Sequence, residues 1–279
     1  IDKTCNELKA SGTIQIGEDD FELMPTFLGH VASFYYIQHK SVKFIASKIK
    51  EGLSIYQLLE ILSHCEEYEE VPMRHNEENL NAALANICPY PVDRNRVDQP
   101  KVKTLLLFQA YFSNLPLPIR DYITDTKLVL DSAVRFLQAM IDISAERSYL
   151  DTLLNLMSLC QMLTQGCWVH ESSLLNIPHF TEEIIKKLRD SERIEHLCQL
   201  LAIQRNGLLS QFLKAIGSKL QPQAMQEIES TIEKIPDVDF KVKLFDFNSD
   251  TMEPVLEKGK KVKGKDEIYI VIDAKRLNA

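Results

Sequence analysis

The apolar residues of this 279-residue chain change their spacing near residue 237, and this change restricts the fold more than any other feature. Between residues 25 and 235 they recur every three or four positions, which is the period of an amphipathic helix. Beyond that point Val238, Phe240 and Val242 alternate with Asp239 and Lys241, which is the two-residue period of a strand. The sequence therefore predicts a mainly α fold with sheet at its C-terminal end.

A shorter strand pair is predicted near the N-terminus. Residues 13–16 and 21–24 flank a Gly-Glu-Asp-Asp turn, so they predict a hairpin that follows a first helix ending near Ser11. Residues 1–24 thus have the pattern of the last fragment of a domain, and the missing initial Met suggests an excised piece. Pro25 suits the first position of the next helix, which we expect to continue through His39.

Capping residues mark further helix starts. Ser41 and Ser54 are the predicted N-caps of the next two helices, and Asn76, followed by two glutamates, is the predicted N-cap of another. Pro100 begins a strongly apolar helix. Further along, Thr181 caps a short helix in a second, smaller helical unit, which ends where Pro236 stops its last helix.

The helix predicted at residues 124–146 has two distinct faces. Its apolar side carries Leu130, Val134, Leu137 and Ile141. Its other side, expected to face outward, carries Asp131, Arg135, Gln138 and Asp142. The following helix is apolar on nearly every side between residues 153 and 163, which predicts a position at the centre of the bundle with the two-faced helix packed beside it.

Composition and motifs exclude several classes of function. The net charge of −8 argues against a free-standing nucleic-acid binder, whose affinity depends on clustered Lys and Arg. The sequence contains no GxxxxGK[ST], GxGxxG or GxSxG motif and no Cys/His ligand set, so we expect no catalytic residue, cofactor or metal within this chain. Six cysteines without a CxxC pair indicate reduced, mostly core thiols of an intracellular protein, and no apolar run is long enough for a membrane span.

Two segments rich in charge leave alternatives open. Residues 71–77 form a dense polar connection between helices, in which Arg74 pairs with an acid among residues 66–70 and His75 satisfies a carbonyl, unless the segment has a recognition role. We expect Pro72, Arg74, His75 and Glu77 to lock the bundle. The lysine-rich segment 258–265 is a solubilising loop or, alternatively, a loop that contacts phosphate.

Several motifs occur in the order found in one helicase family. They are Phe27–Ile37, similar to LGxxASxYYI; Val71–Glu77, similar to PxRHxE; Lys103–Ala110; Ser132–Gln138 with Gln161-Met162; and Trp168 before Leu174–Phe180. Together they span roughly residues 20–190, and the chain thereby resembles the Sec63-type unit of Ski-like superfamily 2 helicases. The polar motif is closer to the signal-cointegrator branch of that family than to its spliceosomal branch.

The resemblance implies the following organisation. Residues 1–24 correspond to the end of a winged-helix-like segment, 25–175 to a helical bundle, 176–236 to a helix-loop-helix domain, and 237–279 to the start of an immunoglobulin- or fibronectin-III-like β-sandwich. The parent chain would be an ATP-dependent RNA or DNA helicase with two RecA-like domains, which bind ATP and Mg²⁺ outside this fragment. Such helicases act in the nucleus and cytoplasm, in processes such as DNA repair and ribosome quality control.

The resemblance also implies how this chain acts. The long two-faced helix of the bundle guides a single nucleic-acid strand, and the positions that carry this role match Ser132, Arg135 and Gln138. Other expected partners are the RecA-like and winged-helix domains of the same chain and further complex subunits, without a membrane. In the simplest alternative, Arg135 only pairs with Asp131. Other functional alternatives are a scaffold of the endoplasmic-reticulum translocon and a pure protein-interaction platform.

Overall fold

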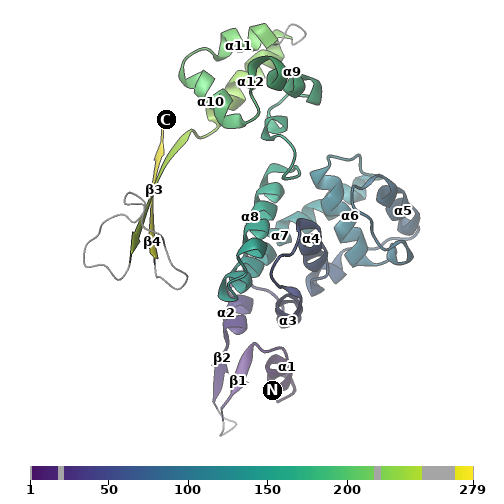
Figure 1. The fold of residues 1–279 in the computed structure, drawn as a ribbon. Helices are drawn as coiled ribbons and strands as arrows, with labels where there is room; N and C mark the ends of the chain where they lie inside the picture. Colours follow the sequence, from purple (N-terminus) through teal and green to yellow (C-terminus); the bar gives the residue numbers. More distant parts are fainter. Residues whose placement is uncertain (1, 18–21, 217–220, 247–267, 279) are drawn as a thin grey trace. The chain divides into compact units, whose positions relative to one another are not determined.

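The computed structural model describes residues 2–17, 22–216, 221–246 and 268–278. The chain forms two compact units, Ile1–Glu171 and Ser172–Ala279. The described residues contain twelve α-helices and two two-stranded antiparallel sheets, so the prediction of a mainly α fold is confirmed (Figure 1). One strand pair is described at the C-terminal end, and the β-sandwich therefore stays a prediction.

The first unit begins with a helix and a hairpin, as the sequence predicts. Helix α1 (Asp2–Ala10) is followed by β1 (Ile14–Ile16) and β2 (Leu23–Pro25), which pair antiparallel. The prediction for Pro25 is wrong, because this residue ends β2 and the next helix begins after Thr26, whose side chain caps it by accepting from the Gly29 N–H at 3.1 Å. A Cβ on Gly29 would lie 2.1 Å from the Thr13 carbonyl oxygen, so the absence of a side chain lets this helix pack directly on the hairpin.

The segment expected to be one helix from residue 25 to 39 forms two. Helix α2 (Phe27–Phe34) ends at Tyr35, and α3 (His39–Lys48) begins after Gln38. Ser41 therefore lies inside α3 and is not its N-cap, and its buried hydroxyl donates to Glu67 and accepts from the Glu66 N–H. The prediction for Ser54 is confirmed, because it forms a capping box with Gln57 at the start of the next helix.

The remaining helices of the first unit surround one hydrophobic core. They are α4 (Ile55–Ser63), η1 (Glu66–Glu70), α5 (Glu77–Ile87), η2 (Arg94–Arg96), α6 (Pro100–Phe112), α7 (Arg120–Glu146) and α8 (Leu150–Gln165). Helix α6 is the central one, since nearly all its residues are buried and it contacts α4, α5 and α7. Helices α7 and α8 lie side by side (Figure 1).

The predicted central position of α8 is wrong. Leu150, Leu154 and Met157 are 45 to 62% exposed along one of its sides, so its apolar character exceeds what this unit buries. Helix α7 begins four residues earlier than predicted, and its buried stripe is also shifted. Val134 is 46% exposed, whereas Phe136 and Leu137 are fully buried.

The second unit has its own, smaller core. It contains η3 (Ser173–Asn176), α9 (Glu182–Glu192), α10 (Leu197–Arg205), α11 (Leu209–Ile216), α12 (Pro222–Lys234), β3 (Val238–Asp246) and β4 (Ile268–Arg276). Thr181 caps α9 as predicted, whereas α11 was missed. Arg205 binds Asp237 through two hydrogen bonds of 2.7 and 2.8 Å, and this ion pair fastens the start of β3 to α10. The lysine-rich segment 258–265 lies outside the described residues.

Strands β3 and β4 form a ribbon with two unlike faces. Val242 pairs with Ile272 and Leu244 with Ile270, and cross-strand partners lie on the same face of a sheet. The alternating positions pair Asp239 with Lys275 and Lys241 with Asp273, so this part of the other face is charged, whereas Val271 and Tyr269 continue it with less polar side chains. The apolar face is open, since Phe240, Val242, Ile270 and Ile272 are 52 to 63% exposed.

Candidate nucleic-acid interface

Helix α7 carries the candidate interface. One side of this helix is buried, and this burial determines which of its side chains face outward. Val129, Ala133, Phe136 and Met140, spaced at four, three and four residues, are all fully buried. Packing against α6 and α8 thus uses one complete side of the helix. Helices α2, α3 and α4 also contact α7, and the side that stays exposed carries Asp131, Val134 and Gln138.

A buried ion cluster anchors the N-terminal half of α7. Lys103 of α6, whose side chain is fully buried, donates from Nζ to Glu77 Oε2 at 2.6 Å and to Asp125 Oδ2 at 2.7 Å. A third hydrogen bond of 2.7 Å goes to the Pro72 carbonyl, so all three ammonium protons have partners. Because Asp125 belongs to α7 and Glu77 to α5, this one ammonium group joins three helices.

Arg74 completes the cluster from its solvent side. Its guanidinium donates to both carboxylate oxygens of Asp125, at 2.6 and 3.0 Å, and to Glu77 Oε1 at 2.9 Å, and it lies 3.3 Å from Asp121. The predicted pairing of Arg74 with an acid among residues 66–70 is therefore wrong. Arg74 pairs instead with two acids that the fold buries, Glu77 and Asp125.

The charges of the cluster shift one another's titration. Burial by itself raises the pKa of Glu77 and of Asp125, but the hydrogen bonds from Lys103 and Arg74 outweigh it and hold both pKa values below their ordinary range. The hydrogen bonds that Arg74 donates to Asp125 and Glu77 raise its own pKa. Arg74, Glu77 and Asp125 are consequently charged at neutral pH.

The rest of the polar motif lies close to this cluster. Asn76 occupies the N-cap position of α5, as predicted, but with a left-handed backbone (φ 66°) and no side-chain cap. Glu77 instead accepts from the Arg74 N–H at 3.1 Å. Pro72 contributes its carbonyl to Lys103, whereas His75 is exposed. Tyr122 covers the ammonium group of Lys103, with 4.7 Å from Nζ to the ring centroid.

The three residues predicted to contact nucleic acid occupy one outer strip of α7. Gln138 is exposed, and Ser132 is half-buried and donates to the Leu128 carbonyl within the helix. Arg135 is half-buried: its Nη1 donates to the Tyr36 carbonyl at 3.2 Å, and its guanidinium lies over the Phe136 ring. The alternative pairing with Asp131 is not formed among the described residues.

The link between α2 and α3 is fastened to the same strip. Besides the Arg135 contact, the Tyr35 hydroxyl donates to Asp142 Oδ2 at 2.6 Å. Burial, together with the hydrogen bond to this carboxylate, raises the pKa of Tyr35 to about 12, so the phenol stays protonated and keeps donating. Residues 135 and 142 are two helical turns apart, and the link therefore runs along α7.

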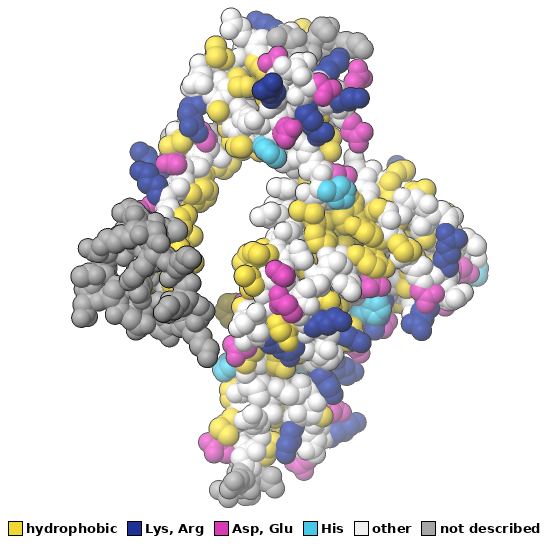
Figure 2. All heavy atoms as spheres, in the orientation of Figure 1, with side chains coloured by type: hydrophobic (Ala, Val, Ile, Leu, Met, Phe, Trp, Pro, Cys, Tyr) yellow, Lys and Arg dark blue, Asp and Glu magenta, His cyan; other side chains and the backbone are white. Residues whose placement is uncertain are grey.

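The charges on the face of the molecule shown in Figure 2 are mixed. Figure 2 shows Lys and Arg side chains interspersed with Asp and Glu on the face in view, without one broad basic area. Within the described part of the chain, no group of three or more His, Cys, Asp or Glu residues is placed to hold a metal ion, and no helix is both long and apolar enough to cross a bilayer. Of the expected core thiols, Cys65 and Cys167 are buried, whereas Cys198 is exposed.

Comparison with known proteins identifies the family. The family model described as the Sec63 Brl domain matches residues 25–272, which is most of the chain. The chain belongs to the Sec63 Brl domain family. It is 40% identical over 268 residues to the DExH-box ATP-dependent RNA helicase DExH14 of Arabidopsis thaliana, covering 94% of this chain and 12% of that protein.

Two further relatives of this Sec63 Brl domain are named as a subunit of a signal cointegrator complex and as a helicase. Activating signal cointegrator 1 complex subunit 3 of Bos taurus is 45% identical over 179 residues, covering 64% of this chain and 8% of that protein. The human U5 small nuclear ribonucleoprotein 200 kDa helicase is 34% identical over 211 residues, covering 75% of this chain and 10% of that protein. The chain thus spans about a tenth of the length of the relatives it matches.

The sequence analysis did not predict that Lys103, Asp125 and Tyr122 belong to the buried ion cluster. One signal could have revealed Asp125: it lies four residues before Val129 and so continues the apolar stripe of α7. A charged residue on an apolar stripe is buried only with a partner. The partner could have been sought in Lys103, which lies in an otherwise apolar stretch of α6.

Proposed function

We propose that this Sec63 Brl domain is a non-motor module of an ATP-dependent helicase and that it guides one nucleic-acid strand along α7. The observation that carries this proposal is the position of Arg135 and Gln138 on the outer strip of a helix whose other side is buried. Three residues apart, they are neighbours on a helix surface, so both can reach one passing strand. An amide and a guanidinium can bond to phosphate or stack on bases without sequence preference.

The buried ion cluster supports this role by holding α7 in place. A strand pulled along α7 exerts force on the helix, and a helix joined to α5 and α6 through Lys103 resists displacement. The motor activity, with its ATP and Mg²⁺, belongs to RecA-like domains elsewhere in the parent protein. The further partners we propose are its winged-helix domain and the other subunits of its complex, in the nucleus and cytoplasm.

The test uses the full-length protein that contains this chain. Arg135→Ala and Gln138→Ala should each weaken binding of a single-stranded oligonucleotide, measured by fluorescence anisotropy, and slow unwinding. If Arg135 meets a phosphate, the slope of log affinity against log salt should fall by about 0.7. Arg96→Ala is the matched control, since Arg96 is 62% exposed and pairs with Asp93 away from α7.

The outcome separates two functions. If both α7 variants bind and unwind as well as the control while losing a protein subunit of the complex, the strip is a protein-docking surface. Strand guidance is then wrong for this module.

A further inference from the structure

The two most exposed large apolar or aromatic side chains in the described residues lie at the end of α2 and on the α2–α3 link that follows it. Phe34 is 81% exposed and Tyr36 is 85% exposed, and no other large hydrophobic side chain exceeds 63%. Leaving two aromatic rings in water is unfavourable, because burying such a side chain contributes roughly 1.5 to 3 kcal/mol. An aromatic ring held in this way is available to stack on another planar group.

Two hydrogen bonds to α7 fix the segment that carries these rings. Tyr36 has a left-handed conformation (φ 55°), which is strained for a residue with an aromatic side chain. Strained positions persist where the surroundings fix them, and they concentrate at functional sites. Here Arg135 fixes the Tyr36 carbonyl, while Phe34 packs edge to face on Tyr35, with ring centroids 4.9 Å apart, and Tyr35 is bound to Asp142.

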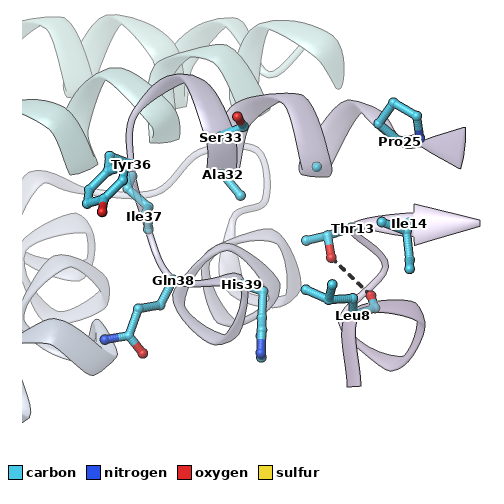
Figure 3. A pocket seen from close by; sticks show the side chains of 11 residues that line it. Leu8, Thr13, Ile14, Pro25, Ala32, Ser33, Tyr36, Ile37, Gln38 and His39 are labelled. Carbon is cyan, nitrogen blue, oxygen red and sulfur yellow. Dashed lines mark hydrogen bonds between the residues drawn. The ribbon is translucent and has the colours of Figure 1, made fainter. Parts of the chain in front are cut away.

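The link also borders a cavity without cationic lining. The cavity has a volume of about 590 Å³ and lies between the end of α1, the hairpin and the α2–α3 link (Figure 3). Neither Lys nor Arg lines it, and the buried Nδ1 of His39 has no hydrogen-bond partner in the described structure. Its surface therefore suits an uncharged group better than a phosphate.

From these observations we propose that Phe34 and Tyr36 form a base-stacking platform for the single strand that passes Arg135. This inference rests on the function proposed above and adds the residues that receive the bases. The phosphates lie toward the α7 strip, the bases stack on the two rings, and the uncharged cavity beside Tyr36 accommodates the base edge or the sugar. Stacking requires no positive charge, so the platform works on a chain with a net charge of −8.

The experiment measures stacking directly in the full-length protein. The probe is a single-stranded oligonucleotide that contains 2-aminopurine, whose fluorescence is quenched when the base stacks. Phe34→Leu and Tyr36→Leu keep apolar surface but remove the aromatic face. We expect each to weaken binding by roughly 5-fold or more and to reduce quenching. Phe34→Tyr and Tyr36→Phe keep the ring and should retain both signals.

Salt dependence distinguishes stacking from strand guidance by α7. The two leucine variants should weaken binding equally at low and high salt, because no ionic contact is lost, whereas Arg135→Ala should change the salt slope. If Arg135→Ala and Gln138→Ala weaken binding but the leucine variants do not, the platform is wrong and strand guidance stands. If the leucine variants bind the oligonucleotide normally but lose a protein subunit, the rings are a protein-docking surface, which also overturns the platform.

Discussion

Lys103→Met should be among the most destabilising single changes in the first unit. Methionine has nearly the shape of lysine and can occupy the same space, so the change removes the charge without leaving a large cavity. Glu77 and Asp125, whose side chains are 2 and 3% exposed, then share one cation, Arg74, and the cluster holds an unbalanced negative charge. Removing one partner of a buried ion pair costs about 3 to 5 kcal/mol.

The assay is urea unfolding followed by tryptophan fluorescence. Trp168 is the single tryptophan of the chain, it is 3% exposed, and its indole N–H donates to Ser113, so its emission reports on the first unit. The matched control is Lys101→Met on the same helix. Lys101 lies 2.8 Å from Glu69 in a pair whose side chains are 23 and 47% exposed, and such a pair contributes only about 0 to 1 kcal/mol.

The pH dependence gives a second readout with a defined sign. In the wild type the pKa values of Glu77 and Asp125 are lowered, so their stabilisation is present above about pH 4 to 5 and is lost as the pH falls through the folded values. In Lys103→Met one carboxylate should take up a proton more readily, so the difference from the wild type should shrink between about pH 7 and 5. If Lys103→Met is within about 1 kcal/mol of Lys101→Met at pH 7, the buried cluster does not anchor α7.

Three further changes test the same architecture, two of them by the same Trp168 assay and one by amide exchange. Arg74→Ala should cost less than Lys103→Met, about 1 to 3 kcal/mol, because its side chain is 36% exposed and water can replace part of its contacts; an unchanged midpoint would favour a recognition role for Arg74. Gly29→Ala should weaken the packing of α2 on the hairpin, and unaltered amide-exchange protection around Thr13 would contradict this. Leu137→Ala should cost about 2 to 5 kcal/mol, since this side chain is fully buried; a loss below 1 kcal/mol would mean that α7 packs through other residues.

Local signals predicted the elements well where each signal had one interpretation. Ser54 and Thr181 precede amphipathic runs, and both cap the helices expected of them. Pro25 and Ser41 failed because each residue type suits more than one position. A proline can end an edge strand as readily as begin a helix, and a serine inside a helix can serve a distant carboxylate, as Ser41 serves Glu67.

The candidate site was predicted in part. Periodicity identified the outward side of α7 with Gln138, but its boundary was shifted, since the sequence does not reveal that Val134 is left 46% exposed. Apart from the Arg74–Glu77 pair, whose residues are three positions apart, the ion cluster depends on contacts between residues 22 to 51 positions apart, which no local pattern encodes. The engagement of Arg135 by the Tyr36 carbonyl is of the same kind, because it joins residues 99 positions apart.

The exposed apolar face of the β3–β4 ribbon also affects which backbone hydrogen bonds of this chain break first in local unfolding. A two-stranded sheet is marginally stable in water, and here the apolar side of the ribbon is exposed to solvent. Its ladder hydrogen bonds should therefore exchange their amide protons before those of α6, while the Arg205–Asp237 pair keeps the start of β3 attached to α10. A surface that covers Val242 and Ile272 would slow this exchange, so the amide-exchange rate of the ribbon reports whether its apolar face is covered.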